Sequence, residues 1–292
     1  MTIQQFKTKA FIFLFGHKKY EHENFRQKTG KILDLEKPER WGEKLIWLNH
    51  NWLPQIKSDC ADKYKVRDYI KSKGFENLLI PLLGVWEDAR EIDFDALPNR
   101  FVLKCNHGCK MNILVQDKDK LDKKAAIKQL NKWKSIDYGK SSYELHYSNI
   151  KPLIICEEFL PVKDDSEIID FKIHCFNGVP KFIGLCFDRD PVTRISKGAI
   201  YSPEWERLNL LKENNDNVSF PKPDNLSKML NIAVQLSKEF PYVRVDLYSI
   251  KGKIYFGELT FTPDGNLPER EYNERASIEI GKWLDLSNLK QQ

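Results

Sequence analysis

Hydrophobic and polar positions alternate in two long stretches of the second half of the chain, and each stretch is divided by a two-residue turn sequence. The first turn is Asn177-Gly178 and the second is Lys251-Gly252. A period of two is typical of strands, and Asn-Gly between two such runs is the strongest short signal for a hairpin. The pattern therefore predicts two antiparallel hairpins, with strands at 168–176, 179–187, 243–248 and 253–262.

Shorter apolar runs in the first half predict strands that alternate with helices. The expected strands lie at 78–86, 101–105, 113–116 and 152–158. Apolar positions recur at helical spacing at 59–73, 122–134 and 226–240, and more weakly at 44–52. Asp59 and Asp122 are suited to cap the first two of these helices, and Gly74 to end the first. Helices and strands mixed in this way indicate an α+β fold.

The composition fits a single compact enzyme. The chain has 292 residues, of which 41% are hydrophobic, so it can bury one substantial core divided between two or three lobes. Its 47 basic and 42 acidic residues leave a net charge of +5, which favours an anionic ligand such as a nucleotide. Nucleic-acid binding is not expected, because the chain has no long Lys/Arg block and no stretch of interleaved basic and aromatic residues.

Six cysteines in a chain of this size are expected to be reduced thiols, several of them buried in strands. Cys105, His107 and Cys109 alternate, but without a second pair of ligands this spacing does not predict a zinc site. No apolar run is long enough to span a membrane, and the short run at 10–16 lacks the cleavage site of a signal peptide. These features predict a cytoplasmic protein without an integral membrane segment.

The second hairpin carries the strongest candidate chemistry. Counting outward from Gly252 places Asp246 opposite Glu258 and Arg244 opposite Thr260, all on one side of the sheet. Magnesium prefers hard oxygen ligands, so two carboxylates beside an arginine predict a site for magnesium and phosphate. A solvated hairpin face is the alternative, but the neighbouring positions are apolar: Val245, Leu247, Phe256 and Leu259.

A second candidate lies at the end of a strand in the first half. Lys104 is followed by the small turn Asn106-His107-Gly108, which can present a cation and backbone N–H groups to phosphate oxygens. The alternative is a surface lysine before an ordinary loop. Neither G-x-x-x-x-G-K-[ST] nor G-x-G-x-x-G occurs in the chain, which argues against a P-loop or Rossmann enzyme. In the first hairpin, the period of two puts Asp170, Lys172 and His174 on one face.

The order of these motifs resembles that of an ATP-grasp domain. The matching elements are Lys104 before a glycine loop, the strand 154–160, Asp170-Phe171-Lys172, Arg244-Val245-Asp246 and Glu258-Leu259-Thr260. More narrowly, residues 60–285 resemble the TupA-like branch, which is found in bacterial teichuronopeptide and surface-polysaccharide biosynthesis. That closer likeness rests on the sequence at 63–69, Leu97-Pro98 before 101–104, Asn106-His107-Gly108 and Asp188-Arg189.

The resemblance implies an α+β ATP-grasp fold in which a nucleotide is held between two lobes with antiparallel sheets. The implied divisions are an N-terminal extension (1–58), the N-terminal part of the ATP-grasp core (59–100), a nucleotide lobe (101–160) and a C-terminal lobe with the magnesium site (161–292).

The resemblance also implies a role for each candidate residue around the nucleotide. Lys104 would contact the α and β phosphates, and the loop with His107 and Gly108 would cover them. Asp165 or Glu167 would hold the ribose hydroxyls. The adenine hinge would be formed by Glu157, Glu158, Phe159 and Leu160.

Around the transferred phosphate, Lys172 would approach the γ phosphate or the substrate, and Arg244 would stabilise the transferring phosphoryl group. Asp246 and Glu258 would ligate magnesium. Thr260 stands where many ATP-grasp enzymes have Asn, which puts a second metal ion in doubt, although its hydroxyl can still ligate a metal or position a water.

The implied activity is ATP- and Mg²⁺-dependent ligation of a carboxylate to an amine through an acyl phosphate. The family context points to a uronic acid of capsular or cell-wall polysaccharide as the carboxylate and to an amino acid, amine or ammonia as its partner. Peripheral association with polysaccharide-assembly enzymes is compatible with this role. His107 and His174 are candidates to accept the amine proton, with a simple hydrogen-bonding role as the alternative.

Two other classes of function compete with this interpretation. Asp93-Phe94-Asp95 is a D-x-D sequence of the kind that holds a divalent ion in glycosyltransferases, although two solvated loop residues before Leu97-Pro98 are the favoured explanation. A non-catalytic nucleotide sensor or sugar-binding partner protein is the third possibility. The joint presence of Lys104, Arg244, Asp246 and Glu258 argues against it, because a protein without catalysis has no physical need for all four.

Overall fold

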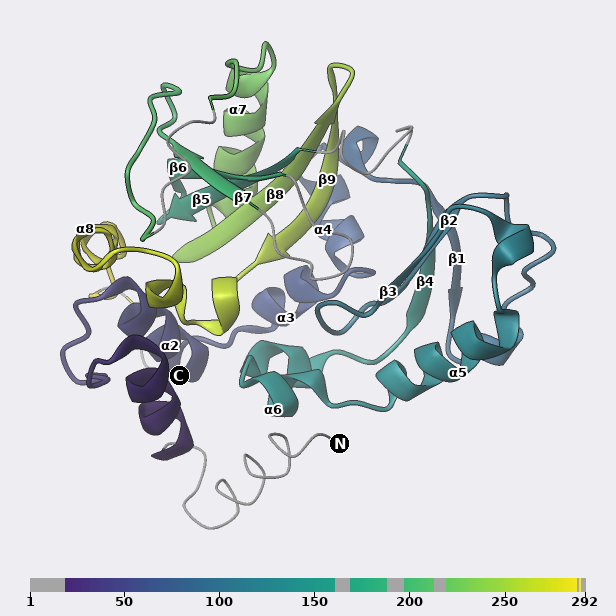
Figure 1. The fold of residues 1–292 in the computed structure, drawn as a ribbon, viewed down its shortest axis with the longest axis horizontal. Helices are drawn as coiled ribbons and strands as arrows, with labels where there is room; N and C mark the ends of the chain where they lie inside the picture. Colours follow the sequence, from purple (N-terminus) through teal and green to yellow (C-terminus); the bar gives the residue numbers. More distant parts are fainter. Residues whose placement is uncertain (1–18, 161–168, 188–196, 213–218, 288, 290–292) are drawn as a thin grey trace.

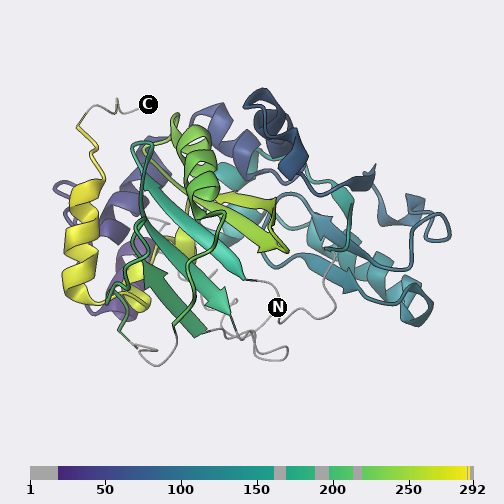
Figure 2. The same cartoon turned by 90° about the horizontal axis from the view of Figure 1, so that it is seen from above.

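The computed structural model describes residues 19–160, 169–187, 197–212, 219–287 and 289. These residues form two lobes that lie side by side, each built on an antiparallel sheet (Figures 1 and 2). The smaller sheet has the strand order β1-β4-β2-β3 and the larger sheet the order β7-β6-β5-β8-β9. Helices combined with two antiparallel sheets confirm the predicted α+β class.

The smaller sheet presents its two faces to different surroundings. In β2, Phe101, Leu103 and Cys105 are buried in a core shared with α5, so Val102 and Lys104 project from the opposite face. Asp122 caps α5 as predicted, since its side chain accepts a hydrogen bond from Ala125 N at 2.9 Å. The elements of this lobe include β1 (Leu82–Trp86), β2 (Phe101–Cys105), β3 (Asn112–Val115), β4 (Ile154–Glu158) and α5 (Lys123–Lys134).

The larger sheet is covered on one face by α7 (Leu226–Ser237), which packs against β5, β6 and β8. Val245 and Leu247 belong to this buried core, and the period of two therefore turns Asp246 to the opposite face, which α7 leaves uncovered. That face is the one that approaches the smaller lobe. The strands are β5 (Asp170–Phe176), β6 (Val179–Phe187), β7 (Lys197–Tyr201), β8 (Tyr242–Ile250) and β9 (Lys253–Thr260).

Both predicted hairpin turns are confirmed. Phe176 pairs with Val179 and Ile250 pairs with Lys253, so each connection has two residues. The turn residues are left-handed, with φ of 48° and 79° at Asn177-Gly178 and of 50° and 78° at Lys251-Gly252. Two left-handed residues match the twist of the strands they join, which explains why these sequences form tight hairpins.

Residues 41–51, which the sequence placed in an N-terminal extension, pack into the larger lobe. Trp41 is fully buried there, and its ring meets those of Phe182 and Tyr272 edge-on at centroid distances of 5.9 and 5.0 Å. The helices of this region are α2 (Trp41–Asn51) and, from the other end of the chain, α8 (Glu274–Trp283).

The single helix predicted at 59–73 is wrong, because the chain forms two helices there. Asp59 lies inside the first helix instead of capping it, and the chain turns at Asp62. The Asp62 carboxylate accepts hydrogen bonds from Tyr64 N and from the Asn106 amide, both at 2.8 Å. The bond from Tyr64 N competes with helical hydrogen bonding, and the bond from Asn106 holds the Asp62 side chain in the turn that ends the helix. The two helices are α3 (Gln55–Ala61) and α4 (Val66–Ser72).

The strand predicted at 78–86 begins four residues later, because a short 3-10 helix at Glu76–Leu78 comes first. Pro81, which has no N–H to donate, precedes the first strand residue. Residues 19–29 are also helical. The remaining elements are α6 (Tyr138–Ser142) and the 3-10 helices at Ala89–Glu91, Lys118–Lys120, Leu145–Asn149, Pro263–Gly265 and Pro268–Arg270.

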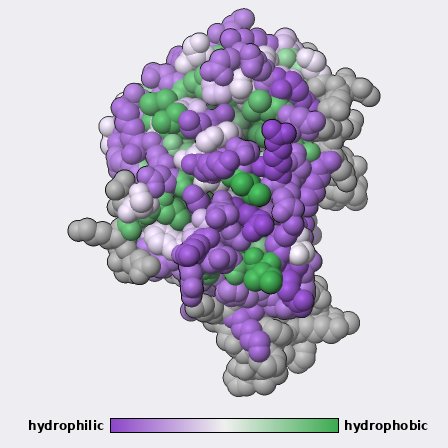
Figure 3. Space-filling view, turned by 90° about the vertical axis from the view of Figure 1, so that its left-hand side faces the viewer, coloured by the Kyte–Doolittle hydropathy of each residue, from purple (hydrophilic) through white to green (hydrophobic). Residues whose placement is uncertain are grey.

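The protein surface is mixed in polarity, and most of the cysteines lie in the interior. On the face of the larger lobe that Figure 3 shows, hydrophobic residues form separate groups among hydrophilic ones. In the described part of the chain, no helix is long and apolar enough to cross a bilayer. The described cysteines form no disulfide, and four are buried: Cys60, Cys105, Cys156 and Cys175.

Candidate active site

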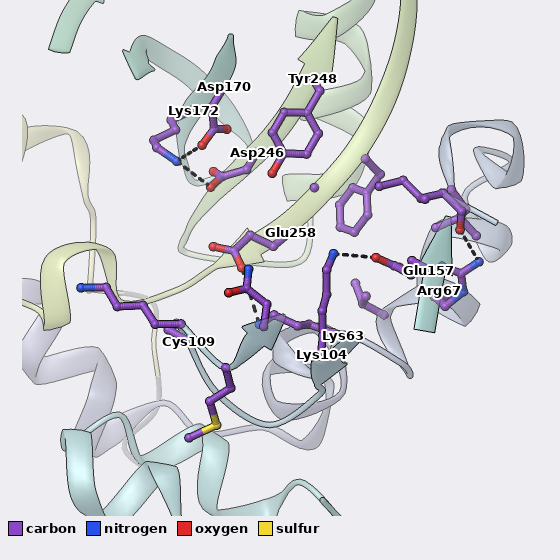
Figure 4. Close-up of a pocket in the computed structure, with 18 residues that line it drawn as sticks. Lys63, Arg67, Lys104, Cys109, Glu157, Asp170, Lys172, Asp246, Tyr248 and Glu258 are labelled. Carbon is purple, nitrogen blue, oxygen red and sulfur yellow. Dashed lines mark hydrogen bonds and ion pairs between the residues drawn. The ribbon is translucent and has the colours of Figure 1, made fainter. Parts of the chain in front are cut away.

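A pocket of about 300 Å³ lies between the uncovered faces of the two sheets (Figure 4). Charged side chains from both lobes and from the segment around the start of α4 project into it. They include Lys63, Arg67, Lys104, Glu157, Asp170, Lys172, Asp246 and Glu258.

The two candidate magnesium ligands face each other across the second hairpin. Asp246 pairs with Glu258 and Arg244 with Thr260, as the sequence predicted. Arg244 binds both oxygens of Asp246, with Nε–Oδ1 and Nη2–Oδ2 distances of 2.7 and 2.6 Å. The Thr260 hydroxyl accepts a hydrogen bond from Arg244 at 3.1 Å and donates one to Glu258 Oε1 at 2.9 Å. Thr260 therefore positions Glu258.

The pairing of Asp246 with Glu258 depends on a β-bulge at Gly257. A two-residue turn at Lys251-Gly252 would by itself place Asp246 opposite Gly257. The register shifts by one residue after Leu247, which is paired with Phe256, and Gly257 is the extra residue. The sequence-based prediction took Gly252 as the centre of the turn and so reached the correct pairing without including the bulge. A bulge of this kind bends the strand and changes the direction of its side chains.

Gly257 is also required sterically, and this gives a first testable prediction. A Cβ atom there would lie 3.0 Å from the Asp246 carbonyl oxygen and 3.1 Å from the Tyr248 ring. We expect Gly257→Ala to lower the free energy of unfolding by about 1–3 kcal/mol, because such overpacking forces the backbone to move. Gly184→Ala is the matched control, since a Cβ at this other strand glycine has its nearest neighbour at 3.7 Å. Urea unfolding of both variants tests this, and equal stability would contradict it.

Lys172 lies between Asp246 and a third carboxylate, that of Asp170. Its ammonium group forms an ion pair with Asp170 and lies 3.3 Å from Asp246 Oδ2 (Figure 4). Burial acts to lower the pKa of Lys172, but the nearby Asp246 and Asp170 outweigh it and raise that pKa. Lys172 is therefore a permanent cation at the uncovered face of the larger sheet.

Glu258 is held as a carboxylate by the cations around it. Burial acts to raise its pKa, but Lys63, Arg244 and Lys172 lower it to about 2. Lys63 lies 3.7 Å from Glu258 Oε2 and donates a hydrogen bond to the Gly108 carbonyl at 2.9 Å. Lys63 thus connects the loop after β2 with a candidate metal ligand of the other lobe.

A second charged group comes from the smaller lobe. Lys104 forms an ion pair with Glu157 Oε2 at 2.6 Å, and Arg67 contacts Glu157 Oε1 at 3.2 Å (Figure 4). Arg67 also donates to the Ile80 carbonyl at 2.9 Å, which fixes its direction. The Glu157 carboxylate, predicted to belong to the adenine hinge, therefore projects into the pocket between two cations.

Several predicted residues do not line the pocket. His107 is 2% exposed and lies 3.2 Å from the Ile136 carbonyl, and Gly108 faces Tyr138. The part of the loop that reaches the pocket is 109–112 instead. Three further predicted residues lie outside the pocket lining: Glu158, Phe159 and Leu160. Arg244 and Thr260 also lie outside it, behind the two carboxylates. Asp165, Glu167 and Asp188-Arg189 fall outside the described residues.

His174 shares the sheet face with Lys172 but lies in an aromatic core away from the pocket. It is 3% exposed, stacks on Phe182 at a centroid distance of 4.1 Å, and contacts the Tyr242 hydroxyl at 2.9 Å. Burial and the nearby Arg244 lower its pKa, so the imidazole is neutral. The structure gives this histidine no contact with the pocket.

Sequence reasoning did not assign Lys63, Arg67 or Asp170 to the site. Lys63 and Arg67 were visible only as two cations four residues apart in a motif, and Asp170 only as a neighbour of Lys172. Tyr248 and Phe256, which form part of the pocket wall, were also missed. Nothing in the local sequence places residues 63–67 beside a hairpin almost two hundred residues later.

The D-x-D aspartates belong to a turn away from this pocket. Asp93 Oδ1 accepts a hydrogen bond from Asp95 N at 3.0 Å, and Asp95 pairs with Lys123 at 2.7 Å. Neither lines the pocket. The motif therefore supplies no metal site beside the other charged residues.

The side chains in the pocket fit a triphosphate and a magnesium ion. Five cations line it, namely Lys63, Arg67, Lys104, Lys110 and Lys172, and the carboxylates provide hard oxygen ligands. Among the described residues, Oδ1 of Asp170 is buried without a hydrogen-bond partner. Among these described residues, no group of three or more His, Cys, Asp or Glu side chains is arranged to hold a metal ion. Magnesium commonly takes one or two carboxylates and completes its shell with phosphate oxygens and water, so the donor set suits it.

The two antiparallel sheets with a charged pocket between them define an ATP-grasp protein. The chain belongs to the TupA-like ATP-grasp family, whose sequence profile matches residues 43–284. A search of curated protein sequences found no match. The family match thus confirms the resemblance that the motifs suggested.

Solved structures with a related fold are distant. The D-alanine–D-alanine ligase from Helicobacter pylori is 14% identical with a TM-score of 0.44, and the match covers 85% of this chain and 70% of that one. The D-cycloserine synthetase DcsG is 13% identical with a TM-score of 0.42, covering 79% and 72%. The ATP-grasp ligase PsnB, complexed with a phosphomimetic variant of its minimal precursor, Mg and ADP, is 12% identical with a TM-score of 0.41, covering 79% and 59%. The family match carries the assignment.

Proposed function

We propose that this protein is an ATP- and Mg²⁺-dependent ligase that joins a uronic acid of surface polysaccharide to an amine or amino acid. The observation that carries the proposal is the Asp246–Glu258 pair, which faces Lys104 and Lys63 across one pocket in a member of the TupA-like ATP-grasp family. Paired carboxylates and opposing cations are what a magnesium–nucleotide complex requires.

Each charged residue has a role in this proposal. Lys104 and Lys63 bind the phosphates from the smaller lobe, and Lys172 binds the transferring phosphoryl group from the larger lobe. Asp246 and Glu258 hold the magnesium ion, which offsets phosphate charge when bound. Arg244 keeps Asp246 in place through two hydrogen bonds. The fixed cations need no rearrangement as charge develops, and this preorganisation lowers the barrier.

The proposed reaction has two steps between the bound substrates. An oxygen of the substrate carboxylate attacks the γ phosphorus of ATP, and ADP leaves, which produces an acyl phosphate. The amine then attacks the acyl carbon, the C–N bond forms, and inorganic phosphate leaves with the former carboxylate oxygen. The proton lost by the amine passes to phosphate or solvent. Holding both substrates in one pocket makes each step effectively unimolecular.

Oxygen labelling tests this path. A substrate whose carboxylate carries heavy oxygen is expected to give inorganic phosphate with one heavy oxygen per molecule, because that oxygen bonds to phosphorus and leaves with it. Mass spectrometry of the phosphate and of the amide measures the transfer. Unlabelled phosphate, a phosphorylated sugar, or AMP as the stoichiometric product would each contradict the acyl phosphate.

A further inference from the structure

Lys110 differs from the other cations of the pocket in having no carboxylate partner. Each of the other four lies 3.7 Å or less from a carboxylate oxygen: Lys63, Arg67, Lys104 and Lys172. Lys110 lines the same pocket, is exposed, and forms no ion pair with any residue that the structure describes. A phosphate that binds one of the paired cations competes with a protein carboxylate, whereas a phosphate that binds Lys110 does not.

Lys110 belongs to a loop that is anchored on both sides of it. The loop joins β2 to β3, and a hydrogen bond from Cys105 N to the Met111 carbonyl at 2.9 Å closes its base. The Cys109 thiol, which precedes Lys110, lies 3.6 Å from the Tyr147 hydroxyl, and Met111, which follows it, is buried. The backbone position of Lys110 is therefore fixed, while its flexible four-carbon side chain borders the pocket.

The backbone at Lys110 has a conformation that lysine rarely adopts. Its φ is 59°, in the left-handed region that Gly and Asn enter more easily. A turn that serves folding alone is expected to have one of those residues at this position. Side chains held in such disfavoured conformations gather at ligand sites, where binding outweighs the conformational cost. Together with the missing carboxylate partner, this conformation indicates that the lysine serves a ligand.

The loop that carries Lys110 lies close to the proposed magnesium ligands. The ammonium group of Lys63 is 2.9 Å from the Gly108 carbonyl oxygen and 3.7 Å from Glu258 Oε2, so one side chain contacts both the loop and a proposed ligand. Lys110 follows Gly108 by two residues. Lys172 approaches the same end of the pocket from the larger sheet (Figure 4). A phosphate bound to magnesium there would have one lysine in each lobe beside it.

We propose that Lys110 is a further catalytic residue, which binds the γ phosphate of ATP from the smaller lobe while Lys172 binds it from the larger lobe. This inference rests on the proposed function, because it takes ATP as the ligand. Lys110 thereby makes the pocket prefer ATP to ADP, which has no γ phosphate. The bond from phosphorus to the ADP oxygen breaks as the bond to the substrate carboxylate oxygen forms. The ammonium group stays protonated and offsets the charge on the transferring group.

The test measures nucleotide binding, so it requires neither the carboxylate nor the amine substrate. Isothermal titration calorimetry of the full chain gives the Kd of Mg²⁺-ADP and of Mg²⁺-adenylyl imidodiphosphate, a triphosphate analogue that is not hydrolysed. We expect Lys110→Gln to weaken binding of the triphosphate analogue ~10-fold, because a charge-assisted hydrogen bond to the γ phosphate is lost. The Kd of ADP is expected to stay within about twofold of the wild-type value.

Three further variants control this comparison. Lys128→Gln removes an exposed lysine of the same lobe that does not line the pocket, and should leave both Kd values within about twofold of wild type. Lys104→Met should weaken the binding of both nucleotides, because the α and β phosphates are common to them. Lys110→Arg keeps the positive charge and should retain the affinity for the triphosphate analogue to within about threefold.

Lys110→Asn separates the loss of the cation from any change in folding. Asn adopts the left-handed conformation more readily than Lys, so this variant should keep the wild-type free energy of unfolding while it lacks the positive charge. We expect it to lose affinity for the triphosphate analogue as Lys110→Gln does. Urea unfolding of both variants checks that the chain is folded.

The outcomes distinguish this inference from the proposed function. Unchanged binding of the triphosphate analogue in both charge-removing variants, or equal losses for ADP and the analogue, would overturn the role of Lys110 and leave the proposed function in place. A wild-type protein that binds neither nucleotide would overturn both. A preference for the triphosphate that depends on Lys110, in a protein that transfers no carboxylate oxygen to phosphate, would refute the ligase and retain the γ-phosphate contact.

Discussion

Glu258→Gln is expected to reduce Mg²⁺-dependent ADP formation about a thousandfold, because the change removes a negative charge from a proposed magnesium ligand with little change in shape. Asp246→Asn should have an effect of the same order. An assay of ADP release at saturating ATP and magnesium measures both. Turnover near the wild-type rate in both variants would remove the metal assignment.

The two variants should differ in stability, which separates folding from catalysis. Asp246 is 3% exposed at its side chain and lies between Arg244 and Lys172. Its neutralisation leaves the buried Arg244 without its closest partner, a change that commonly costs about 3–5 kcal/mol of unfolding free energy. Glu258 is more exposed, so Glu258→Gln should lose less stability and is the cleaner test of catalysis.

Asp95→Asn provides a matched control for these two variants. It removes a carboxylate of the D-x-D turn, which pairs with Lys123 at the surface and does not line the pocket. We expect ADP formation to be unchanged. Loss of activity in this variant would mean that the turn takes part in the reaction and would revive a nucleotide-sugar mechanism.

Lys172→Met and Lys104→Met are expected to impair ATP use by different routes. Lys172 contacts two carboxylates at the proposed magnesium site, so its loss should lower kcat ~100-fold by removing positive charge where the phosphoryl group transfers. Lys104 belongs to the other sheet and pairs with Glu157, so its loss should raise the KM for ATP by about 10–100-fold.

Steady-state kinetics with varied ATP separates the two effects. Lys222→Met, a change at an exposed lysine of the larger lobe, is the control for loss of one positive charge. Equal and small changes in kcat and KM for both pocket variants would contradict the proposal that Lys172 acts in phosphoryl transfer and Lys104 in ATP binding.

The two hairpins could be predicted from local sequence. Asn177-Gly178 and Lys251-Gly252 adopt left-handed conformations that few other residue pairs accept, so the positions of these turns alone define two strand pairs. The family followed from the order of the motifs, whereas the facing of Asp246 and Glu258 also required the bulge at Gly257, which the turn alone does not indicate. The turns and the motif order depend on neighbours in the chain, which the sequence displays directly.

Failures of sequence reasoning had nonlocal causes. The helix expected at 59–73 breaks at Asp62 because this carboxylate binds Asn106, a residue more than forty positions away. At the bulge, Gly257 lies against the neighbouring strand, where a Cβ atom would be only 3.0 Å from the Asp246 carbonyl oxygen and 3.1 Å from the Tyr248 ring. His174, a candidate by its place on the strand face, lies in an aromatic core that includes Trp41.

The sequence by itself determined the α+β class, the two hairpins and the ATP-grasp family, because periodicity, turn residues and motif order are properties of the chain itself. The tertiary structure decided which cations meet the carboxylates of the pocket. Lys63 and Arg67 enter the pocket only because α4 packs between the lobes, and Glu157 turns toward Lys104 only because β4 pairs with β2. Such long-range contacts depend on how separate elements bury their apolar faces together, and no local pattern encodes that packing.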